Sequence, residues 1–522
     1  MSLCCWKAMF WSYYRTFCDV YILLFMACIP AVTVSIIALR LWLQYRGKKS
    51  LPHLRVPGDS GKVPVVVGFF HPYCNAGGGG ERVLWTAIRA IQRKHPDVRC
   101  VIYTGDTDVT GEQILSRVRQ RFNIILPRPD RQFIDFVFLH RRHWVEADRY
   151  AHFTLLGQSL GSLVLGFEAL TKCVPDLYID TMGYAFTLPL FRYLGGCRIA
   201  CYVHYPTIST DMLKQVASRT ESYNNAAFIS KNRVFSRIKV LYYHFFAFLY
   251  GIMGNRSDVV MVNSTWTFNH IRALWQATDR THIVYPPCDT SEFLQLPLDG
   301  ATGKTKHCIV SVAQFRPEKD HALQLIAFEK FLSGLPDSER HRYHLELVGS
   351  CRDASDAARV EHLRDLCEQL AIVESVEFKI NVSFAELKDC LAGATVGLHT
   401  MWNEHFGICV VECMAAGTVM LAHNSAGPKM DIVTEYKGHQ TGFLADDASS
   451  YANALTTIFE MSAADRLDMM RHARLSVSRF SDKKFEEAFL DCVRPLIELC
   501  VRDLRREHEE VFVEEEEADV AS

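Results

Sequence analysis

Short runs of apolar residues alternate along the chain with longer segments in which apolar and polar residues mix. The first runs are rich in β-branched and aromatic residues and are short enough to be buried strands: residues 63–70, 98–103, 177–180, 199–204 and 259–263. The segments between them have room for helices, and the first of these spans Glu81 to about Lys94. Strands that alternate with helices in this way predict a doubly wound parallel sheet.

A second alternating set begins after Tyr285-Pro286-Pro287, which we interpret as a hinge. Its expected strands are residues 307–313, 344–348, 376–378, 395–399 and 419–422. The pattern therefore predicts an α/β fold with two Rossmann-like domains, 63–285 and 286–482, and a helix over 483–502 that crosses back over their junction. Ligands of such sheets bind at the carboxyl ends of the strands, so we expect the site in the cleft between the domains.

An uncharged and mostly apolar run of 20 residues, 20–39, precedes the first domain. As a helix it would span ~30 Å, the thickness of a hydrocarbon core. More basic residues follow the run than precede it, which places its C-terminal side in the cytosol. We predict a lumenal N-terminus (1–19), one transmembrane helix as an anchor (20–42) and a linker (43–62). A cleaved signal peptide is the alternative, although no Ala-x-Ala site follows the run.

Charge and cysteine content add to this outline. The 522 residues carry a formal charge of −2, but residues 503–522 hold nine acids and two arginines, a net of −7, which leaves +5 for the rest. We predict that this acidic tail is solvated and disordered. The 18 cysteines include no Cys-x2-Cys pair, which favours reduced thiols in a cytosolic domain.

A basic segment around residues 231–239 leads into an apolar and aromatic one, 241–253. The apolar part is too short to span a bilayer. A helix on the membrane surface and a helix buried in the protein core fit this pattern about equally well.

Two glutamates separated by seven residues, Glu404 and Glu412, lie in a stretch that reads strand, loop, helix. Gly407 would open the helix, and Glu412 would lie inside it, about one and a half turns along. A helix N-terminus offers unpaired N–H groups to an anion, and both carboxylates can accept hydrogen bonds from sugar hydroxyls. The arrangement predicts a nucleotide-sugar pocket, with ordinary helix-start and surface charges as the alternative.

Two further segments could bind an anion at the same cleft. The loop from Gly77 to Gly80 follows the first strand and opens a helix, so its backbone can approach a ligand closely. Arg316 and Lys319 follow the first strand of the second domain, where two cations could bind a diphosphate and stabilise it as it leaves. A flexible turn and a solvated basic turn are the respective alternatives.

Taken together, these segments resemble the retaining glycosyltransferases of family 4 over most of the chain after about residue 63. The resemblance implies the glycosyltransferase B fold, in which two Rossmann-like domains face each other. It implies that Glu404 contacts the donor sugar, that Glu412 contacts the nucleotide ribose, and that Lys319 binds the diphosphate. Further residues matched to the family's sites are His204 near the transferred sugar, Phe406, Gly407 and Gly427 at the donor, and Gly77, Gly78, Gly79, Gly80 and Arg82 at the acceptor or its phosphate.

One position departs from the family pattern. Family members often carry arginine where this chain has Gln314, two residues before Arg316. Either Arg316 takes over that role or the diphosphate is held differently. Because the chain has no Asp-x-Asp pair beside this site, we expect no metal or other cofactor, with Arg316, Lys319 and the Gly407 helix terminus stabilising the leaving diphosphate.

The membrane anchor and the motifs around His71, His204 and Gln314 narrow the resemblance to the family's α-1,2-mannosyltransferases of the endoplasmic reticulum membrane. That implies GDP-mannose as donor, a dolichol-diphosphate-linked trimannosyl-chitobiose as acceptor, and catalytic domains on the cytosolic face. Other mannosyltransferases of the same pathway are possible partners, and no nucleic acid is expected. Two alternatives stay open: another nucleotide-sugar donor such as UDP-N-acetylglucosamine, or an inactive scaffold subunit.

Overall fold

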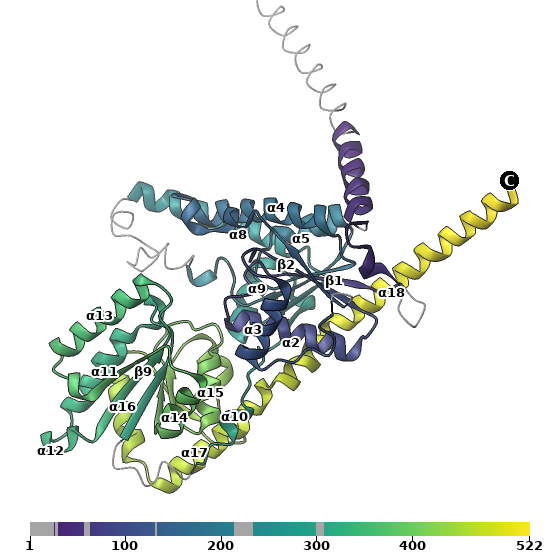
Figure 1. The fold of residues 1–522 in the computed structure, drawn as a ribbon. Coiled ribbons are helices and arrows are strands. Elements are labelled where there is room, and N and C mark those ends of the chain that lie inside the picture. Colours follow the sequence, from purple (N-terminus) through teal and green to yellow (C-terminus); the bar gives the residue numbers. More distant parts are fainter. Residues whose placement is uncertain are drawn as a thin grey trace, which may run out of the picture.

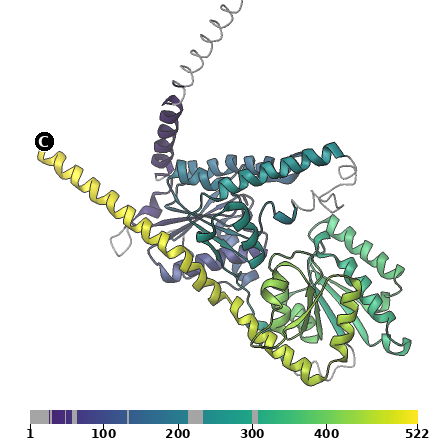
Figure 2. The ribbon, with the colours of Figure 1, turned by 180° about the vertical axis from the view of Figure 1, so that it is seen from behind.

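The structure, a computed structural model, describes residues 26, 30–47, 49–56, 63–130, 133–212, 233–298 and 307–521. Two α/β domains follow one another along the chain, each built on one parallel sheet with helices on both faces (Figure 1). A long C-terminal helix runs from the second domain back along the first (Figure 2). The architecture therefore agrees with the two-domain prediction from the sequence.

The sheet of the N-terminal domain has seven strands in the order β3-β2-β1-β4-β5-β6-β7, and every neighbouring pair is parallel. The strands are β1 (Val66–Phe70), β2 (Arg99–Thr104), β3 (Ile134–Phe138), β4 (Leu177–Asp180), β5 (Arg198–Val203), β6 (Val259–Val262) and β7 (Thr281–Ile283). The five strands expected from the sequence are confirmed with small shifts at their ends. The sequence analysis missed β3 and β7, which form the two edges of the sheet.

Helices cover both faces of this sheet because alternate strand residues point to opposite sides. In β1, Val66 and Phe70 pack into one apolar core, whereas Val67 and Phe69 pack into the other. The first core is covered by α4 (Thr154–Lys172), α5 (Thr187–Leu190), α8 (Arg233–Gly254) and α9 (Thr265–Trp275). The second is covered by α2 (Gly79–Lys94), α3 (Gly111–Phe122) and α18 (Asp482–Ala521).

The C-terminal domain has a six-stranded parallel sheet in the order β10-β9-β8-β11-β12-β13. Its strands are β8 (His307–Val312), β9 (Tyr343–Gly349), β10 (Val376–Ile380), β11 (Val396–Leu398), β12 (Val419–His423) and β13 (Gly442–Ala445). The five predicted strands are again confirmed, and the edge strand β13 was missed. The helices that position or flank the site are α11 (His321–Ser333), α13 (Ala354–Gln369), α14 (Phe384–Gly393), α15 (Ile408–Ala416), α16 (Ala448–Glu460) and α17 (Ala463–Ser476).

Helix α18 joins the two domains a second time. It begins at Asp482, beside the C-terminal domain, and its apolar side, including Phe485 and Val493, completes the core that α2 covers. The crossing helix predicted for 483–502 therefore packs where we expected it. The helix continues to Ala521, so the described part of the acidic segment, 503–521, has helical backbone where we expected none, which agrees with the good helix propensity of glutamate.

The expected linker, 43–62, is partly packed on the N-terminal domain. Residues 30–47 are helical, and Leu43 at the end of this helix is fully buried. Leu54 is also buried, and Arg55 Nη1 lies 2.6 Å from Asp176 Oδ2. The sequence suggested a linker because prolines and glycines are frequent here, but its three leucines, Leu43, Leu51 and Leu54, pack against the apolar core of the domain.

Nine of the 23 residues of the expected membrane anchor, 20–25 and 27–29, lie outside the described residues. Within the part of the chain that the structure describes, no helix is both long and apolar enough to cross a bilayer.

Helix α8 settles how the aromatic segment 241–253 is buried. Phe246 and Tyr250 are buried in the core, whereas Leu241, Phe245 and Phe248 are 71%, 51% and 63% exposed. The segment is therefore a core helix on one side and has an exposed apolar stripe on the other.

Candidate functional site

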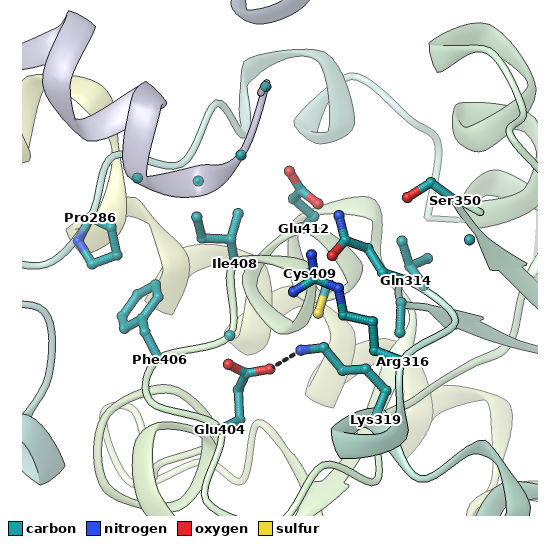
Figure 3. Close-up of a pocket in the computed structure, with 18 of the residues that line it drawn as sticks. Pro286, Gln314, Arg316, Lys319, Ser350, Glu404, Phe406, Ile408, Cys409 and Glu412 are labelled. Carbon is teal, nitrogen blue, oxygen red and sulfur yellow. Dashed lines mark hydrogen bonds and ion pairs between the residues drawn. The ribbon is translucent and has the colours of Figure 1, made fainter. Parts of the chain in front are cut away.

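A cavity of about 770 Å³ opens between the two domains. Its walls include the carboxyl ends of β5, β8 and β9, and residues from both domains line it. This is the place where parallel α/β sheets bind ligands, and the volume is typical of a small-molecule site. Figure 3 shows the pocket, with α15 and the turn after β8 contributing most of the labelled side chains.

The cavity brings together most of the residues that the sequence nominated. They are His204, Arg316, Lys319, Glu404, Phe406, Gly407, Glu412 and the four glycines Gly77, Gly78, Gly79 and Gly80. Gly427 and Arg82 do not line it.

Glu404 forms an ion pair with Lys319 on the floor of the cavity (Figure 3). Its Oε2 atom also lies 3.3 Å from Nε2 of the buried His399. Burial alone would raise the pKa of Glu404, but the Lys319 ammonium and His399 outweigh it and hold that pKa well below its ordinary value. Glu404 is therefore a carboxylate at neutral pH, so it can accept hydrogen bonds and stabilise positive charge.

The pKa of His399 is shifted in the opposite direction, upward. Burial would lower its pKa, yet the hydrogen bonds and charges of Cys409 and Glu404 raise it to about 9. The His399 side chain is only 4% exposed, so it contacts Glu404 inside the protein and does not meet a ligand itself. Sequence reasoning missed this residue, although its place at the end of a predicted strand was a usable signal.

A short hydrogen-bonded network fixes Lys319 relative to Glu404. The Thr400 hydroxyl donates to the backbone oxygens of Lys319 and Asp320, at 2.9 and 3.0 Å. Gln324 in turn donates to the Thr400 hydroxyl at 2.9 Å. These hydrogen bonds therefore hold the turn after β8, which carries Lys319, against the loop after β11, which carries Glu404.

Helix α15 begins at the cavity. Its N-cap, Gly407, has a φ of 107°, which side chains other than glycine rarely adopt, and no side chain caps the helix start. Ile408 and Cys409 of the first turn line the cavity. The positive end of the helix dipole is thus turned toward the space where an anion would lie.

Glu412 lies one turn further along α15 and lines the cavity. Among the described residues, nothing forms a hydrogen bond or ion pair with its carboxylate. Burial raises its pKa to about 7, and the charge of Arg82 opposes the shift only partly. A partly buried carboxylate without a partner is well suited to bind ligand hydroxyls.

Arg316 and Gln314 line the cavity beside Lys319 (Figure 3). The nearest acid to Arg316 in an ion pair is Glu318, at 3.7 Å, and its buried Nε atom has no partner in the described part of the chain. The guanidinium is therefore available to an anionic ligand. Gln314, which stands where the family often has arginine, faces the same space as an uncharged group.

The glycine loop closes the cavity from the N-terminal domain. A Cβ atom on Gly79 would lie 2.9 Å from Ile408 Cδ1, so the starts of α2 and α15 approach each other across the cleft. A Cβ on Gly80 would lie 3.4 Å from Nε2 of His204. Burial lowers the pKa of His204 to about 4, so its ring is neutral at physiological pH, and its buried Nε2 has no partner among the described residues.

The structure gives Gly427 a supporting position. Its N–H donates to the Glu404 carbonyl oxygen at 2.9 Å, and a Cβ there would lie 2.4 Å from the carbonyl oxygen of Phe406. Gly427 therefore holds the loop that carries Glu404. The sequence analysis had instead placed Gly427 at the donor, but it does not line the cavity.

The structure also places Arg82 away from the phosphate-binding role that we expected. Its guanidinium donates to Asp482 at 3.0 Å and to the carbonyl oxygens of Pro287 and Phe122. Because these partners belong to the hinge, to α18 and to the end of α3, Arg82 ties the domain junction together. Arg82 is the fourth residue of α2, and only the first two residues of that helix, Gly79 and Gly80, line the cavity, which explains the difference.

Potential metal ligands lie elsewhere. Within the described ranges, the one group of three side chains that could hold an ion is His439, Asp468 and His472, and none of these lines the interdomain cavity.

Two family descriptions match the chain in tandem. Residues 64–275 match "ALG11 mannosyltransferase N-terminus", and residues 299–475 match "Glycosyl transferases group 1". A Mus musculus protein named GDP-Man:Man(3)GlcNAc(2)-PP-Dol alpha-1,2-mannosyltransferase is 56% identical over 87% of this chain and 91% of its own length. The chain belongs to the ALG11 mannosyltransferase family. Proteins of the same name from Homo sapiens and Dictyostelium discoideum are 56% and 48% identical, over 88% and 84% of this chain and 91% and 86% of their own lengths.

Solved structures support the fold of this ALG11 family member. Anabaena HepE in complex with UDP-glucose aligns with a TM-score of 0.55 at 14% identity, over 82% of this chain and 99% of that one. The α,α-trehalose 6-phosphate synthase of Burkholderia multivorans aligns with a TM-score of 0.59 at 13% identity, over 83% and 99%. At such identities the similarity shows the shared two-domain glycosyltransferase fold alone.

Proposed function

We propose that this protein transfers mannose from GDP-mannose to a dolichol-diphosphate-linked trimannosyl-chitobiose, forming α-1,2 linkages. The observation that carries the proposal is the 56% identity, over 87% of the chain, with the Mus musculus enzyme named for that reaction. The interdomain cavity adds chemical support, because it combines cations, a helix N-terminus and two glutamates that suit a nucleotide sugar.

The donor diphosphate would lie between the cations and the helix start. Arg316 and Lys319 supply positive charge from the turn after β8, and the first turn of α15 supplies unpaired N–H groups. Negative charge grows on the diphosphate as the glycosidic bond breaks, so fixed positive groups there lower the barrier. Glu412 would accept hydrogen bonds from the ribose hydroxyls of the donor nucleotide.

Transfer would proceed with retention by attack of the acceptor hydroxyl on the same face that the diphosphate leaves. Glu404 is held as a carboxylate by Lys319 and His399, which suits hydrogen bonding to the mannose and stabilisation of an oxocarbenium-like transition state. His204, neutral and with a free Nε2, would hydrogen-bond the transferred sugar from the opposite domain. The donor phosphate would take the acceptor proton.

The enzyme would act at the cytosolic face of the endoplasmic reticulum membrane as a single-pass protein. Three features support this: the uncharged run 20–39, the exposed valines and isoleucines of the helix that continues it, and the exposed stripe on α8. The acceptor is a lipid at that surface, so an anchor would raise its effective concentration. Other mannosyltransferases of the pathway are its natural neighbours there.

The test is sugar transfer by the purified full-length protein to a synthetic lipid-diphosphate trimannosyl-chitobiose, with GDP-mannose and UDP-N-acetylglucosamine offered in parallel. We expect mannose to be transferred and then released by an α-1,2-mannosidase. Transfer from UDP-N-acetylglucosamine instead would overturn the donor assignment. Absence of transfer from either donor, in protein that still binds GDP, would favour an inactive scaffold.

A further inference from the structure

A second cavity, of about 370 Å³, lies in the N-terminal domain beside the interdomain one. It is formed by the loop after β4, the segment 145–147 and the inner sides of α4 and α8. Tyr205, which follows His204 at the end of β5, lines both cavities, so the two are neighbours at this residue. The volume is within the range of small-ligand sites.

The walls of this second cavity combine aromatic rings with hydroxyl, amide and carboxylate groups. Tyr73, Tyr184 and Tyr205 supply rings, and among the described residues none of their hydroxyls has a hydrogen-bond partner. Ser159 of α4 likewise has a side-chain hydroxyl free of partners in the described structure, and Glu146 contributes a partly exposed carboxylate. Rings that stack on an apolar face beside free polar groups are the chemistry of a sugar-binding site.

The charge of the lining favours a neutral ligand over a diphosphate. No lysine or arginine is among the described residues that line the cavity, and Glu146 would repel phosphate. Arg142, which contacts Tyr73 and Glu146, is paired with Asp106 and does not line the cavity. The free hydroxyls also make the cavity a poor fit for a hydrocarbon tail alone, since they would be buried without partners.

We propose that this cavity is an acceptor subsite that binds a pyranose of the acceptor oligosaccharide on the lipid side of the mannose that receives the new sugar. Tyr205 lines both this cavity and the donor site, which puts the next sugars of the acceptor within reach. Its other wall is made by Ser159 and Ser162 of α4 and by Tyr250 of α8, and the far side of α8 bears the exposed apolar stripe. An oligosaccharide in the subsite would thus run from the donor toward the lipid-facing side.

The inference rests on the proposed function, so its experiment must separate the two. The variant Ser159→Phe fills the cavity from a partly exposed helix position without touching the donor site. Kinetics are measured at saturating GDP-mannose with two acceptors: the lipid-diphosphate trimannosyl-chitobiose and a shorter lipid-linked mannoside that ends in the same accepting sugar. GDP binding is measured by calorimetry in parallel.

In the wild type we expect kcat/KM for the long acceptor to exceed that for the short one by at least tenfold. In Ser159→Phe that preference should fall to within about threefold, through a higher KM for the long acceptor, with GDP affinity unchanged. Glu146→Gln and Tyr184→Phe, which preserve shape, should lower the preference by smaller factors. Leu160→Phe is the matched control, because Leu160 is the next residue of α4, is 50% exposed and does not line the cavity.

The outcomes are distinct. A wild type that transfers no mannose refutes the proposed function, whatever the variants do. An active wild type whose length preference survives in Ser159→Phe refutes the subsite. Equal losses on both acceptors in Ser159→Phe, with Tyr184→Phe unchanged, would mean that the cavity serves the fold alone and would also overturn it.

Discussion

At the scale of single residues, Lys319 has two assigned roles that one substitution can test. It is the partner of Glu404 and also the expected ligand of the diphosphate. Lys319→Ala removes a positive charge from the place where the leaving group gains negative charge. We expect kcat to fall by about 10²–10³-fold, as when one preorganised donor to a developing anion is lost. Steady-state transfer from GDP-mannose measures the effect, with Lys330→Ala on the outer side of α11 as the control. Near-normal turnover in Lys319→Ala would remove this residue from the diphosphate site.

The raised pKa of Glu412 leads to a prediction about how GDP affinity depends on pH. Burial raises the pKa of its carboxyl to about 7 in the ligand-free protein. If the carboxylate accepts hydrogen bonds from ribose hydroxyls, the ligand favours the deprotonated form, and GDP affinity should rise several-fold between pH 6 and pH 8. Calorimetry of GDP binding at both values tests this, with Glu412→Gln as the reference that removes this titration and keeps all others. Equal pH dependence in the two proteins would contradict the role.

The same shift has a consequence for stability. A carboxyl whose folded-state pKa is raised keeps its proton longer in the native protein, so its stabilising effect is complete below its ordinary pKa and is lost as pH rises through about 7. The melting temperature of the wild type should therefore fall relative to Glu412→Gln as the pH is raised from 5 to 8. A constant difference between the two melting temperatures would show that the carboxyl does not titrate in this range.

Residues differ in how far the sequence could predict them. Glu404, Lys319, Glu412 and the glycines meet in the cavity as expected, because they lie at strand ends or helix starts, and a parallel sheet gathers such positions at one edge. Arg82 lies away from the cavity because, two residues after the glycine loop, its guanidinium reaches the hinge and α18, a contact that only the tertiary structure creates. His399 was missed although it follows a predicted strand, because its contact with Glu404, five residues later, depends on how the loop between them folds.

At the scale of elements, the three strands that the sequence analysis missed are β3, β7 and β13, and all are edge strands. Edge strands bury less surface and carry a weaker apolar pattern: β3 contains Asp135 and β7 is three residues long. Central strands such as β4 and β12 are buried throughout, so their apolar runs stand out. The strands inside the sheets were therefore predictable, whereas of the four edge strands only β10 was predicted from the sequence.

The loop that carries Glu404 depends on one contact between elements, which Gly427→Ala would break. A methyl group there meets the carbonyl oxygen of Phe406 at 2.4 Å, so the loop must move together with Glu404. We expect KM for GDP-mannose to rise at least tenfold, because a displacement of about 1 Å is costly at a reacting centre. Gly438→Ala is the control: its φ of +83° strains the backbone, but no atom lies within 4 Å, so it should lower only the melting temperature. Unchanged donor kinetics in Gly427→Ala would show that the loop position is not critical.

At the scale of the whole molecule, the position of the membrane relative to the two domains decides how the acceptor arrives. The structure indicates where the proposed anchor can be removed. Leu43 is buried and Gln44 donates to the Gly195 carbonyl oxygen at 3.1 Å, so a cut after residue 45 would damage the domain. Deletion of residues 1–38 removes the exposed valines and isoleucines of this helix and leaves those contacts. We expect this variant to keep the wild-type melting temperature and GDP affinity, because none of the described residues of either cavity precedes Tyr73.

The same deletion should separate chemistry from delivery. With a short-chain, water-soluble acceptor, transfer by the 1–38 deletion should match the wild type, since both cavities are intact. With a dolichol-length acceptor in vesicles, kcat/KM should fall by at least tenfold, because the acceptor is then no longer concentrated beside the enzyme. Replacing Phe245 and Phe248 of the α8 stripe by glutamate should enlarge the loss on vesicles alone, as both side chains are more than half exposed. Full activity of the deletion variant on vesicles would show that neither the anchor nor its surroundings bring the lipid to the site.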